Sequence, residues 1–479
     1  MLIRQFSITR KESILLSALF AVGFALIGTS IDAAHFSTLL LFLFIVLTGL
    51  SLCHKTWCSV ADLKLRILGF FWLIKLSLTL ALLYAGWIPQ LDPGSLSWGY
   101  DPQRFYQESY DLLLNDWTPT ANLNYQGILY YYAVIFYFFD HNPVIPAMVN
   151  AFVTLLGSLF LIRCFYAFAP RRSAKNWLIS ALLLVPEVLW FDVMTSRETL
   201  MASLVITAIL VPGRYLIGIN KLSLMGTLIV FVLTSVGILA IRTSMMIPVV
   251  VSIAVMVLIL KSRRRTRSIF KLGLVGMGIA VLFAGPLLQQ ITGGYEFNYL
   301  RVLNQLQSFE NNVASQMEWG DSSIGLLLAP SNFWQAIAFT PPRMLLYLVA
   351  PLPKVEISLI DLLDGSWEAW QLLMTLPTSI LILVGFPYVL AQTAQAWNER
   401  YRFPAALIIP IAFWTNFIAV AGGNIIIHER YRLMFTLLLF ACMGLGHSQC
   451  DLSVVKRWAV LWFVFLAGAS LFYIIYKLV

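Results

Sequence analysis

Long apolar runs recur from one end of the chain to the other, separated by short polar segments. A helix of about twenty apolar residues is long enough to cross a bilayer. The pattern therefore predicts an all-α polytopic membrane protein with about thirteen spans. These spans are expected near residues 12–31, 36–53, 66–86, 144–167, 176–193, 198–217, 222–240, 244–260, 268–287, 369–394, 403–421, 430–446 and 458–477.

Two longer segments interrupt this pattern, at residues 87–143 and 288–368. The first contains an aromatic run at 125–139 that is too short for a comfortable crossing. Tyrosine rings suit the membrane interface, so we expect an interfacial segment there. The second ends in a proline-rich stretch from Thr340 to Pro353. Because proline breaks regular helix, we expect a re-entrant or interfacial segment at this point.

These features divide the chain into four parts. We expect N-terminal accessory transmembrane helices at 1–65 and a transmembrane core at 66–287 that includes the first outer loop. The second outer loop follows at 288–368, and C-terminal transmembrane helices occupy 369–479. The first hydrophobic run has no small-residue cleavage motif, so we expect it to remain as a helix.

The composition supports a protein that lies largely within a membrane. Hydrophobic residues make up 59% and charged residues 11% of 479 positions, against roughly 25% charged residues in soluble domains. The net charge of +9 would suggest nucleic-acid binding in a soluble protein. Here the distribution of the charges matters more, because basic residues are retained on the cytoplasmic side of a membrane.

A cytoplasmic N-terminus places the basic clusters of the chain inside. These clusters are Arg4/Arg10/Lys11, Lys55/Lys64/Arg66, Arg171/Arg172/Lys175, Lys261 to Arg267 and Lys456/Arg457. The same topology puts the C-terminus outside, and it leaves no reason to expect a nucleic-acid partner.

The cysteines and histidines do not predict a metal site. All five cysteines fall in predicted spans or cytoplasmic loops, where disulfides are not expected. Cys53 and Cys58 have only His54 near them, and His428 has no second ligand at a suitable spacing. We therefore expect no cofactor, and a divalent metal is optional.

With this topology, acids and bases from distant parts of the chain meet at the outer face. The acids are Asp101, Glu108, Asp192, Glu198 and Glu429, and the bases are Arg104, Arg197, Arg242, Arg343, Lys354, Arg430 and Arg432. A positioned carboxylate can take a proton from an attacking hydroxyl or amine. Arginine can neutralise a phosphate through paired hydrogen bonds. Together these groups suit a lipid-phosphate glycosyl donor that meets a polar acceptor at the membrane surface.

Several of these residues also have a purely structural explanation. Arg197 and Glu198 could form a charge pair at a helix start, with Glu198 well placed in the first turn. Arg430 and Arg432 could simply extend toward the interface to keep their charges in water. Glu187 lies within an apolar run, where an ionisable group is costly and often functional.

A series of short motifs follows in a fixed order along the chain. The motifs are Tyr100-Asp101-Pro102-Gln103-Arg104-Phe105-Tyr106, Gly127-Ile128-Leu129-Tyr130, Pro146 to Gly157, Val185-Pro186-Glu187, Ser196-Arg197-Glu198-Thr199-Leu200 and His428-Glu429-Arg430-Tyr431-Arg432. This order resembles the GT-C superfamily of membrane glycosyltransferases, close to its protein-mannosyltransferase and lipid A aminoarabinose-transferase branch. The resemblance covers roughly residues 66–217 and, more loosely, 336–446.

The resemblance implies a GT-C-like transmembrane helix bundle with outer-face juxtamembrane helices, with the catalytic core at 66–287. It implies an inverting glycosyltransferase whose general base is Asp101 and in which Glu198 orients the acceptor or the sugar. The expected substrate contacts are Arg104, Tyr106, Arg197, Arg242, Arg343, Arg430 and Arg432. Many family members carry paired acids in the first loop. Pro102 follows Asp101 in this chain, so Asp92 or Glu108 is the candidate for the second acid.

The expected partners are a polyprenyl-phosphate-linked sugar donor, a glycan or lipid acceptor and membrane lipids. The expected location is the plasma membrane, the inner membrane of a bacterium, with the active site on the outer face. No soluble acceptor-binding domain is apparent, which argues against a protein acceptor. The alternatives are a carrier-linked polysaccharide polymerase or ligase and, in a different class, a lipid-linked-sugar flippase or transporter. A transporter typically shows paired internal repeats, and we find none in this sequence.

Overall fold

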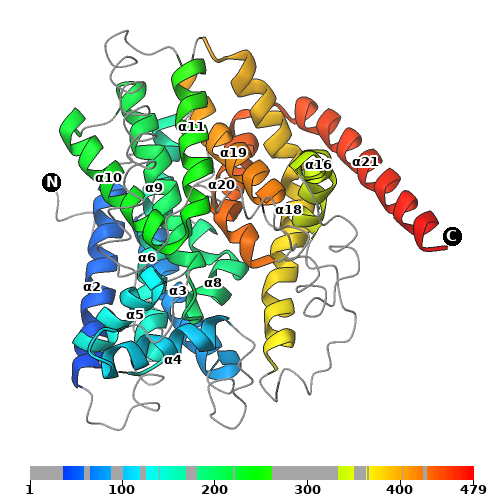
Figure 1. Cartoon of the computed structure of the whole chain (residues 1–479). Helices are drawn as coiled ribbons and strands as arrows, with labels where there is room; N and C mark the ends of the chain where they lie inside the picture. Colours follow the sequence, from blue (N-terminus) through cyan, green and yellow to red (C-terminus); the bar gives the residue numbers. More distant parts are fainter. Residues whose placement is uncertain are drawn as a thin grey trace.

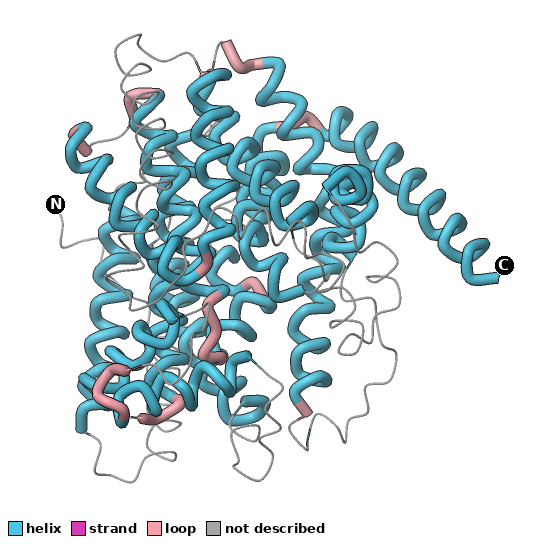
Figure 2. Tube along the Cα trace, viewed as in Figure 1, coloured by secondary structure: helices cyan, strands magenta, loops and turns pink. Residues whose placement is uncertain are grey.

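The computed structural model of the chain describes residues 36–58, 65–87, 101–118, 126–139, 141–168, 181–219, 222–260, 333–349, 363, 366–401, 403–423 and 429–478. Among these residues the regular elements are helices, and no strand is present (Figure 2). The prediction of an all-α protein is confirmed for this part of the chain.

The helices form one bundle, drawn with their labels in Figure 1. The α-helices are α2 (Phe36–Cys58), α3 (Leu65–Leu82), α4 (Asp101–Leu114), α5 (Gln126–Phe138), α6 (Val144–Phe168), α8 (Pro186–Val193), α9 (Glu198–Leu216), α10 (Leu224–Ile241), α11 (Met246–Ile259), α16 (Phe333–Val349), α18 (Trp367–Asn398), α19 (Ile408–Gly423), α20 (Glu429–Gln449) and α21 (Leu452–Leu478). Shorter helical turns are η2 (Leu83–Trp87), η4 (Ala181–Leu184), η5 (Thr243–Met245) and η6 (Pro404–Leu407).

Within the described residues, 7 helical segments are long and apolar enough to cross a membrane. They are Leu68–Trp87, Val144–Phe165, Glu198–Leu216, Leu224–Ile241, Ala369–Asn398, Pro404–Gly422 and Leu452–Ala469. Each overlaps a span predicted from the sequence, so the prediction of a polytopic membrane protein is confirmed. Shorter apolar helices, Thr38–His54 and Met246–Ile259, lie at two more predicted spans. The predicted spans 12–31 and 268–287 lie outside the described residues.

Helix α20 lies in the interior of the bundle, packed against α9, α18 and α19 (Figure 1). Its residues Leu438 and Leu445 are completely buried. Near its start, Arg430 and Arg432 pair with carboxylates of other helices. Helix α21 differs, since it projects from one edge of the bundle and exposes apolar residues such as Val460 and Val464. That exposed apolar surface suits a helix in contact with lipid tails.

Two glycines allow helix backbones to approach closely. A Cβ atom at Gly446 of α20 would lie 2.2 Å from the carbonyl oxygen of Tyr388 in α18. A Cβ atom at Gly127 of α5 would lie 2.1 Å from the carbonyl oxygen of Ala240 in α10. Any side chain at these positions would force the backbones apart, so glycine fixes α5 against the end of α10.

The predicted span 176–193 is not one continuous helix in its described part. The 3-10 turn η4 ends at Leu184, and the separate helix α8 begins at Pro186. Val185 between them is extended, with φ −61° and ψ 119°. Proline has no backbone N–H and disfavours helical geometry in the residue before it, which explains the break. The break leaves Glu187 in the first turn of a short helix.

The prediction that prolines interrupt the helix after Thr340 is also wrong. Helix α16 runs from Phe333 to Val349 with Pro341 and Pro342 inside it. Each proline removes one backbone hydrogen bond of the helix. Helix α16 packs along α18 and α19, and this packing offsets the loss.

A buried ion pair joins α3 to α8. The ammonium group of Lys75 contacts the carboxylate of Asp192, and both side chains are buried. The hydroxyl of Thr154 on α6 donates a hydrogen bond of 2.9 Å to Asp192 Oδ1. Asp192 was expected at the outer face with the other acids, but here it holds three helices together. A charge that leaves water needs such partners, because an unpaired buried charge is costly.

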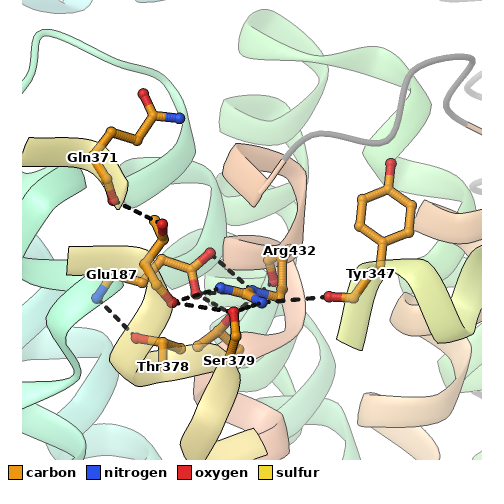
Figure 3. A network of polar contacts seen from close by, with 8 residues as sticks. Glu187, Tyr347, Gln371, Thr378, Ser379 and Arg432 are labelled. Atoms are coloured by element: carbon orange, nitrogen blue, oxygen red, sulfur yellow. Dashed lines mark hydrogen bonds and ion pairs between the residues drawn. The ribbon is translucent and has the colours of Figure 1, made fainter. Parts of the chain in front are cut away.

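A second buried ion pair connects α8 to α20 (Figure 3). Arg432 Nε lies 3.0 Å from Glu187 Oε2, and neither side chain is exposed. Arg432 Nη1 also donates to Ser379 Oγ of α18 at 2.8 Å, and the backbone N–H of Glu187 donates to Thr378 Oγ1 at 3.2 Å. The carbonyl of Tyr347 on α16 completes the surroundings of the guanidinium. This network fixes α20 relative to α8, α16 and α18.

Candidate functional site

Helices α4 and α5 pack together at one end of the bundle, at the bottom of Figure 1. Asp101 is the first residue of α4, and Arg430 lies in the first turn of α20. Arg430 Nη1 donates a hydrogen bond of 2.6 Å to Asp101 Oδ2. The side chains are 35% exposed for Asp101 and 27% exposed for Arg430. The pair joins two distant parts of the sequence and remains accessible from outside the protein.

Arg197 and Glu198 begin α9 next to this pair. Arg197 Nε lies 3.6 Å from Glu198 Oε1, and the guanidinium of Arg197 lies over the ring of Phe105 at 6.0 Å. Arg197 acts electrostatically on Asp101, and Glu198 acts on Arg430. The two charged residues of the α9 start therefore belong to the same local site as the Asp101–Arg430 pair.

Arg242, at the end of α10, reaches the site through Tyr431. The guanidinium of Arg242 lies 4.8 Å from the centre of the Tyr431 ring, and that of Arg430 lies 4.9 Å from it. Arg430 Nη2 also donates to the Tyr431 hydroxyl at 2.9 Å. An aromatic face attracts cations, so Tyr431 keeps two guanidinium groups close together despite their repulsion. We refer to Asp101, Arg197, Glu198, Arg242, Arg430 and Tyr431 as the charged cluster.

Nearby arginines favour the ionised form of Asp101. Burial raises the pKa of Asp101, but the positive charges of Arg430, Arg197 and Arg104 outweigh this effect and bring the pKa below its ordinary value. Asp101 is therefore ionised at neutral pH. A carboxylate held in this way is a weak base, because a general base works best with a pKa near the operating pH.

Hydrogen bonds fix the turn between α8 and α9, and with it Arg197 and Glu198. Asn150 Nδ2 of α6 donates to the carbonyl of Met194 at 2.7 Å. The hydroxyl of Tyr132 on α5 donates to the carbonyl of Ser196 at 2.7 Å. The hydroxyl of Thr195 donates to the carbonyl of Pro102, next to Asp101 in α4. These bonds fix the start of α9, with Arg197 and Glu198, relative to the start of α4 that carries Asp101.

The start of α9 has unused hydrogen-bonding capacity within the described part of the chain. Its N-cap residue, Arg197, makes no side-chain cap. Ser196 Oγ, Thr199 Oγ1 and Arg197 Nε are buried and have no hydrogen-bond partner among the described residues. The first N–H groups of a helix have no partner in that helix, and the helix dipole favours negative charge there. The α9 start is therefore suited to an anionic group.

The other predicted site residues lie elsewhere or play different parts. Arg104 Nε pairs with Glu108 Oε1 at 2.6 Å on α4, close enough for Arg104 to act on Asp101. Tyr106 packs against the His141 ring, with centroids 4.3 Å apart, and is mostly buried. Asp92, the other candidate for the second acid, lies outside the described residues.

Two of the predicted arginines are not members of the cluster. Arg432 is buried against Glu187 and does not share the surroundings of Arg430, although the sequence predicted both as phosphate contacts. Arg343 is completely buried in α16, where Tyr347 contributes to its electrostatic surroundings.

Tyr431 and Lys75 were missed by the sequence reasoning. A lone lysine in an apolar run is a signal that could have identified Lys75, since such charges need partners.

The described residues contain no group of three or more histidine, cysteine, aspartate or glutamate side chains that could hold a metal ion. Comparisons with protein-family models, with curated proteins and with solved structures find no match to this chain. The chemistry of the site therefore follows from the charged cluster itself. Its carboxylates can accept a proton or orient a hydroxyl, and its arginines can hold a phosphate.

Proposed function

We propose that the protein is an inverting, GT-C-type membrane glycosyltransferase. It takes a sugar from a polyprenyl-phosphate carrier at the outer face of the membrane and serves the assembly of a cell-envelope glycan or glycolipid. The observation that carries the proposal is the charged cluster, in which the partly exposed carboxylate of Asp101 pairs with Arg430. Arg197 acts electrostatically on Asp101, and Arg242 acts on Arg430 from the end of α10. The acid for acceptor activation and the bases for a phosphate leaving group thus stand side by side.

In the proposed reaction, the acceptor hydroxyl transfers its proton to Asp101 as its oxygen attacks the anomeric carbon of the donor sugar. The bond between this carbon and the phosphate oxygen breaks, and its electron pair leaves with the polyprenyl phosphate. Attack from the face opposite the phosphate inverts the anomeric configuration. Arg197, Arg242 and Arg430 neutralise the developing negative charge, as arginines do for phosphate groups. Glu198 orients the acceptor or the sugar.

The arrangement of the helices supports a lipid-linked donor. The cluster lies where α4 meets the start of α9 and α20 and the end of α10. Helices α9 and α10 are themselves apolar enough to cross a membrane. A carrier with its prenyl chain among the lipids could therefore present its phosphate to the cluster without leaving the bilayer.

A first experiment tests this without knowledge of the sugar. Purified protein in lipid nanodiscs is titrated with polyprenyl phosphate and, separately, with the uncharged polyprenol, and binding is followed by native mass spectrometry. We expect polyprenyl phosphate to bind at least about tenfold more tightly, the gain of one charged hydrogen bond. Equal affinity for the alcohol and the phosphate would contradict the proposal.

The buried ion pairs favour a second candidate, a flippase for lipid-linked sugars. Lys75–Asp192 and Glu187–Arg432 lie within the apolar bundle, and charges inside membrane helices often mark transport pathways. Both candidates bind a polyprenyl phosphate, but only a transferase releases it from a sugar donor. Proteoliposomes loaded with a panel of polyprenyl-phosphate sugars distinguish the two, because a flippase moves the intact donor across the bilayer. A polymerase or ligase would use the same chemistry with a growing glycan as the acceptor.

A further inference from the structure

We propose that Asp101 competes with the donor phosphate for Arg430, so that phosphate binding releases Asp101 to act as the base. The inference rests on the proposed function and deepens it. It assigns Arg430 as an exchangeable anion contact, and it couples activation of the acceptor to occupation of the donor site. The anion that exchanges with Asp101 is a phosphate monoester or diester of a lipid carrier.

The first argument is the geometry of the pair. Arg430 Nη1 already makes a hydrogen bond of 2.6 Å to a carboxylate oxygen. A phosphate oxygen would use the same donor in the same way, because guanidinium groups bind both kinds of anion through charged hydrogen bonds. Arg430 Nη2 is held by the Tyr431 hydroxyl at 2.9 Å. The donor fork therefore keeps its position when one anion replaces the other.

The second argument is accessibility. The Asp101 side chain is 35% exposed and the Arg430 side chain is 27% exposed, whereas Arg432 and Glu187 are completely buried in the neighbouring pair. An ion pair that water reaches contributes less net stability than its distance suggests, whereas separating a fully buried pair leaves uncompensated charges inside the protein. The Asp101–Arg430 pair can therefore open in the presence of a competing anion, while the Glu187–Arg432 pair stays closed.

The third argument concerns what must move. Thr195 holds the carbonyl of Pro102, the residue next to Asp101 in α4. This bond ties the start of α4 to the turn before α9. We therefore expect the exchange to involve rotation of the Asp101 side chain about its Cα–Cβ bond, with α4 staying in place.

The exchange has a chemical consequence for catalysis. While Arg430 holds Asp101, the positive charge disfavours protonation of the carboxylate and makes it a poor proton acceptor. Once the phosphate takes over Arg430, Asp101 loses this partner and gains a negative neighbour. Both changes raise its affinity for a proton. The base becomes effective when the donor is bound.

The test compares the affinity for polyprenyl phosphate of the wild-type protein with that of Asp101→Asn and Asp101→Ser, all in nanodiscs. Removing the competing carboxylate should strengthen binding by about threefold to tenfold, the range for loss of one partly exposed charged contact. Asp111→Asn is the matched control. Asp111 lies on the same helix, where its carboxylate accepts a hydrogen bond from Gln107, and its loss should leave the affinity unchanged. Asp101→Ser provides a second variant because serine is favoured at helix starts.

The double variant Asp101→Asn/Arg430→Gln identifies the route of the effect. If Asp101→Asn strengthens polyprenyl-phosphate binding by freeing Arg430, the double variant binds no more tightly than Arg430→Gln alone. Unchanged or weaker binding in both Asp101 variants, with melting temperatures like that of the wild type, overturns the inference. The proposed function fails separately, when the wild-type protein does not distinguish polyprenyl phosphate from polyprenol.

Discussion

Arg430 and Arg432 stand two positions apart on α20 and pair with different carboxylates, Asp101 on α4 and Glu187 on α8. Residues with this spacing do not face the same side of a helix. As a result, one arginine reaches a partly exposed site, and the other is locked between helices. The proposed function therefore gives substrate contact to Arg430 and a structural role to Arg432.

Lysine substitutions test this division of roles. Arg430→Lys should weaken polyprenyl-phosphate binding by roughly tenfold to a hundredfold, equivalent to ~1.5–3 kcal/mol, because lysine cannot reproduce the planar donor fork. Arg432→Lys should instead lower the melting temperature and leave the affinity of the folded protein within about twofold, since Arg432 is completely buried against Glu187. Wild-type affinity in Arg430→Lys would show that the residue only needs a cation on a long side chain.

The Glu187–Arg432 pair should dominate the stability of the bundle interior. Glu187→Gln leaves a buried guanidinium without its countercharge, which typically costs about 3–5 kcal/mol. Replacing both charged residues, in Glu187→Gln/Arg432→Met, removes the buried charge and should recover part of that loss. Denaturation of the purified protein in mixed detergent micelles measures both effects. A double variant that is less stable than the single one would show that the other hydrogen bonds of Arg432 matter more than its charge.

Thr195 should act as a positioning residue for the cluster. Thr195→Val removes the hydrogen bond to the carbonyl of Pro102 at a cost of about 1 kcal/mol in folding free energy. Because the bond ties the α9 start to Asp101, we expect kcat to fall more than donor affinity does. Thr195→Ser keeps the hydroxyl and should restore kcat. A valine variant with the kcat of the wild type would assign Thr195 to stability alone.

The helices follow directly from apolar run length, which is why spans such as Leu68–Trp87 and Leu224–Ile241 could be predicted. Run length does not say what surrounds a helix. Residues 430–446 were predicted as a span, but run length alone did not show that protein encloses α20 and supplies partners for its charges. Likewise, the prolines after Thr340 were expected to break the helix because of their local backbone geometry. In the structure Pro341 and Pro342 lie inside α16, which packs against α18 and α19.

The candidate site was predictable in part because charged residues are rare within membrane spans and gather at the ends that water reaches. This reasoning singled out Asp101, Glu198 and Arg430, which the structure places close together. It could not show which of Arg430 and Arg432 belongs to the cluster, because that depends on the rotation of α20 about its axis. It also missed Tyr431, since an aromatic residue between two arginines has no distinctive one-dimensional signal.

The proposed outer-face location of the cluster depends on the topology. Reporter fusions after Asp116 and after Lys271 should report opposite sides of the membrane, because the basic run Lys261 to Arg267 is retained in the cytoplasm. Asp116 follows α4, the helix that carries Asp101. Finding both reporters on the same side would contradict the topology and the proposed side of the reaction together.

The central claim is that Asp101 is the base of a transferase that uses a polyprenyl-phosphate donor. Its most direct test is release of free polyprenyl phosphate from a panel of polyprenyl-phosphate sugars, in the presence of membrane acceptors, by wild-type protein, Asp101→Asn and the control Asp111→Asn. We predict release by the wild type and the control, and a loss of at least about a hundredfold in Asp101→Asn, the typical contribution of a general base. Release at the wild-type rate by a folded Asp101→Asn protein would contradict the account.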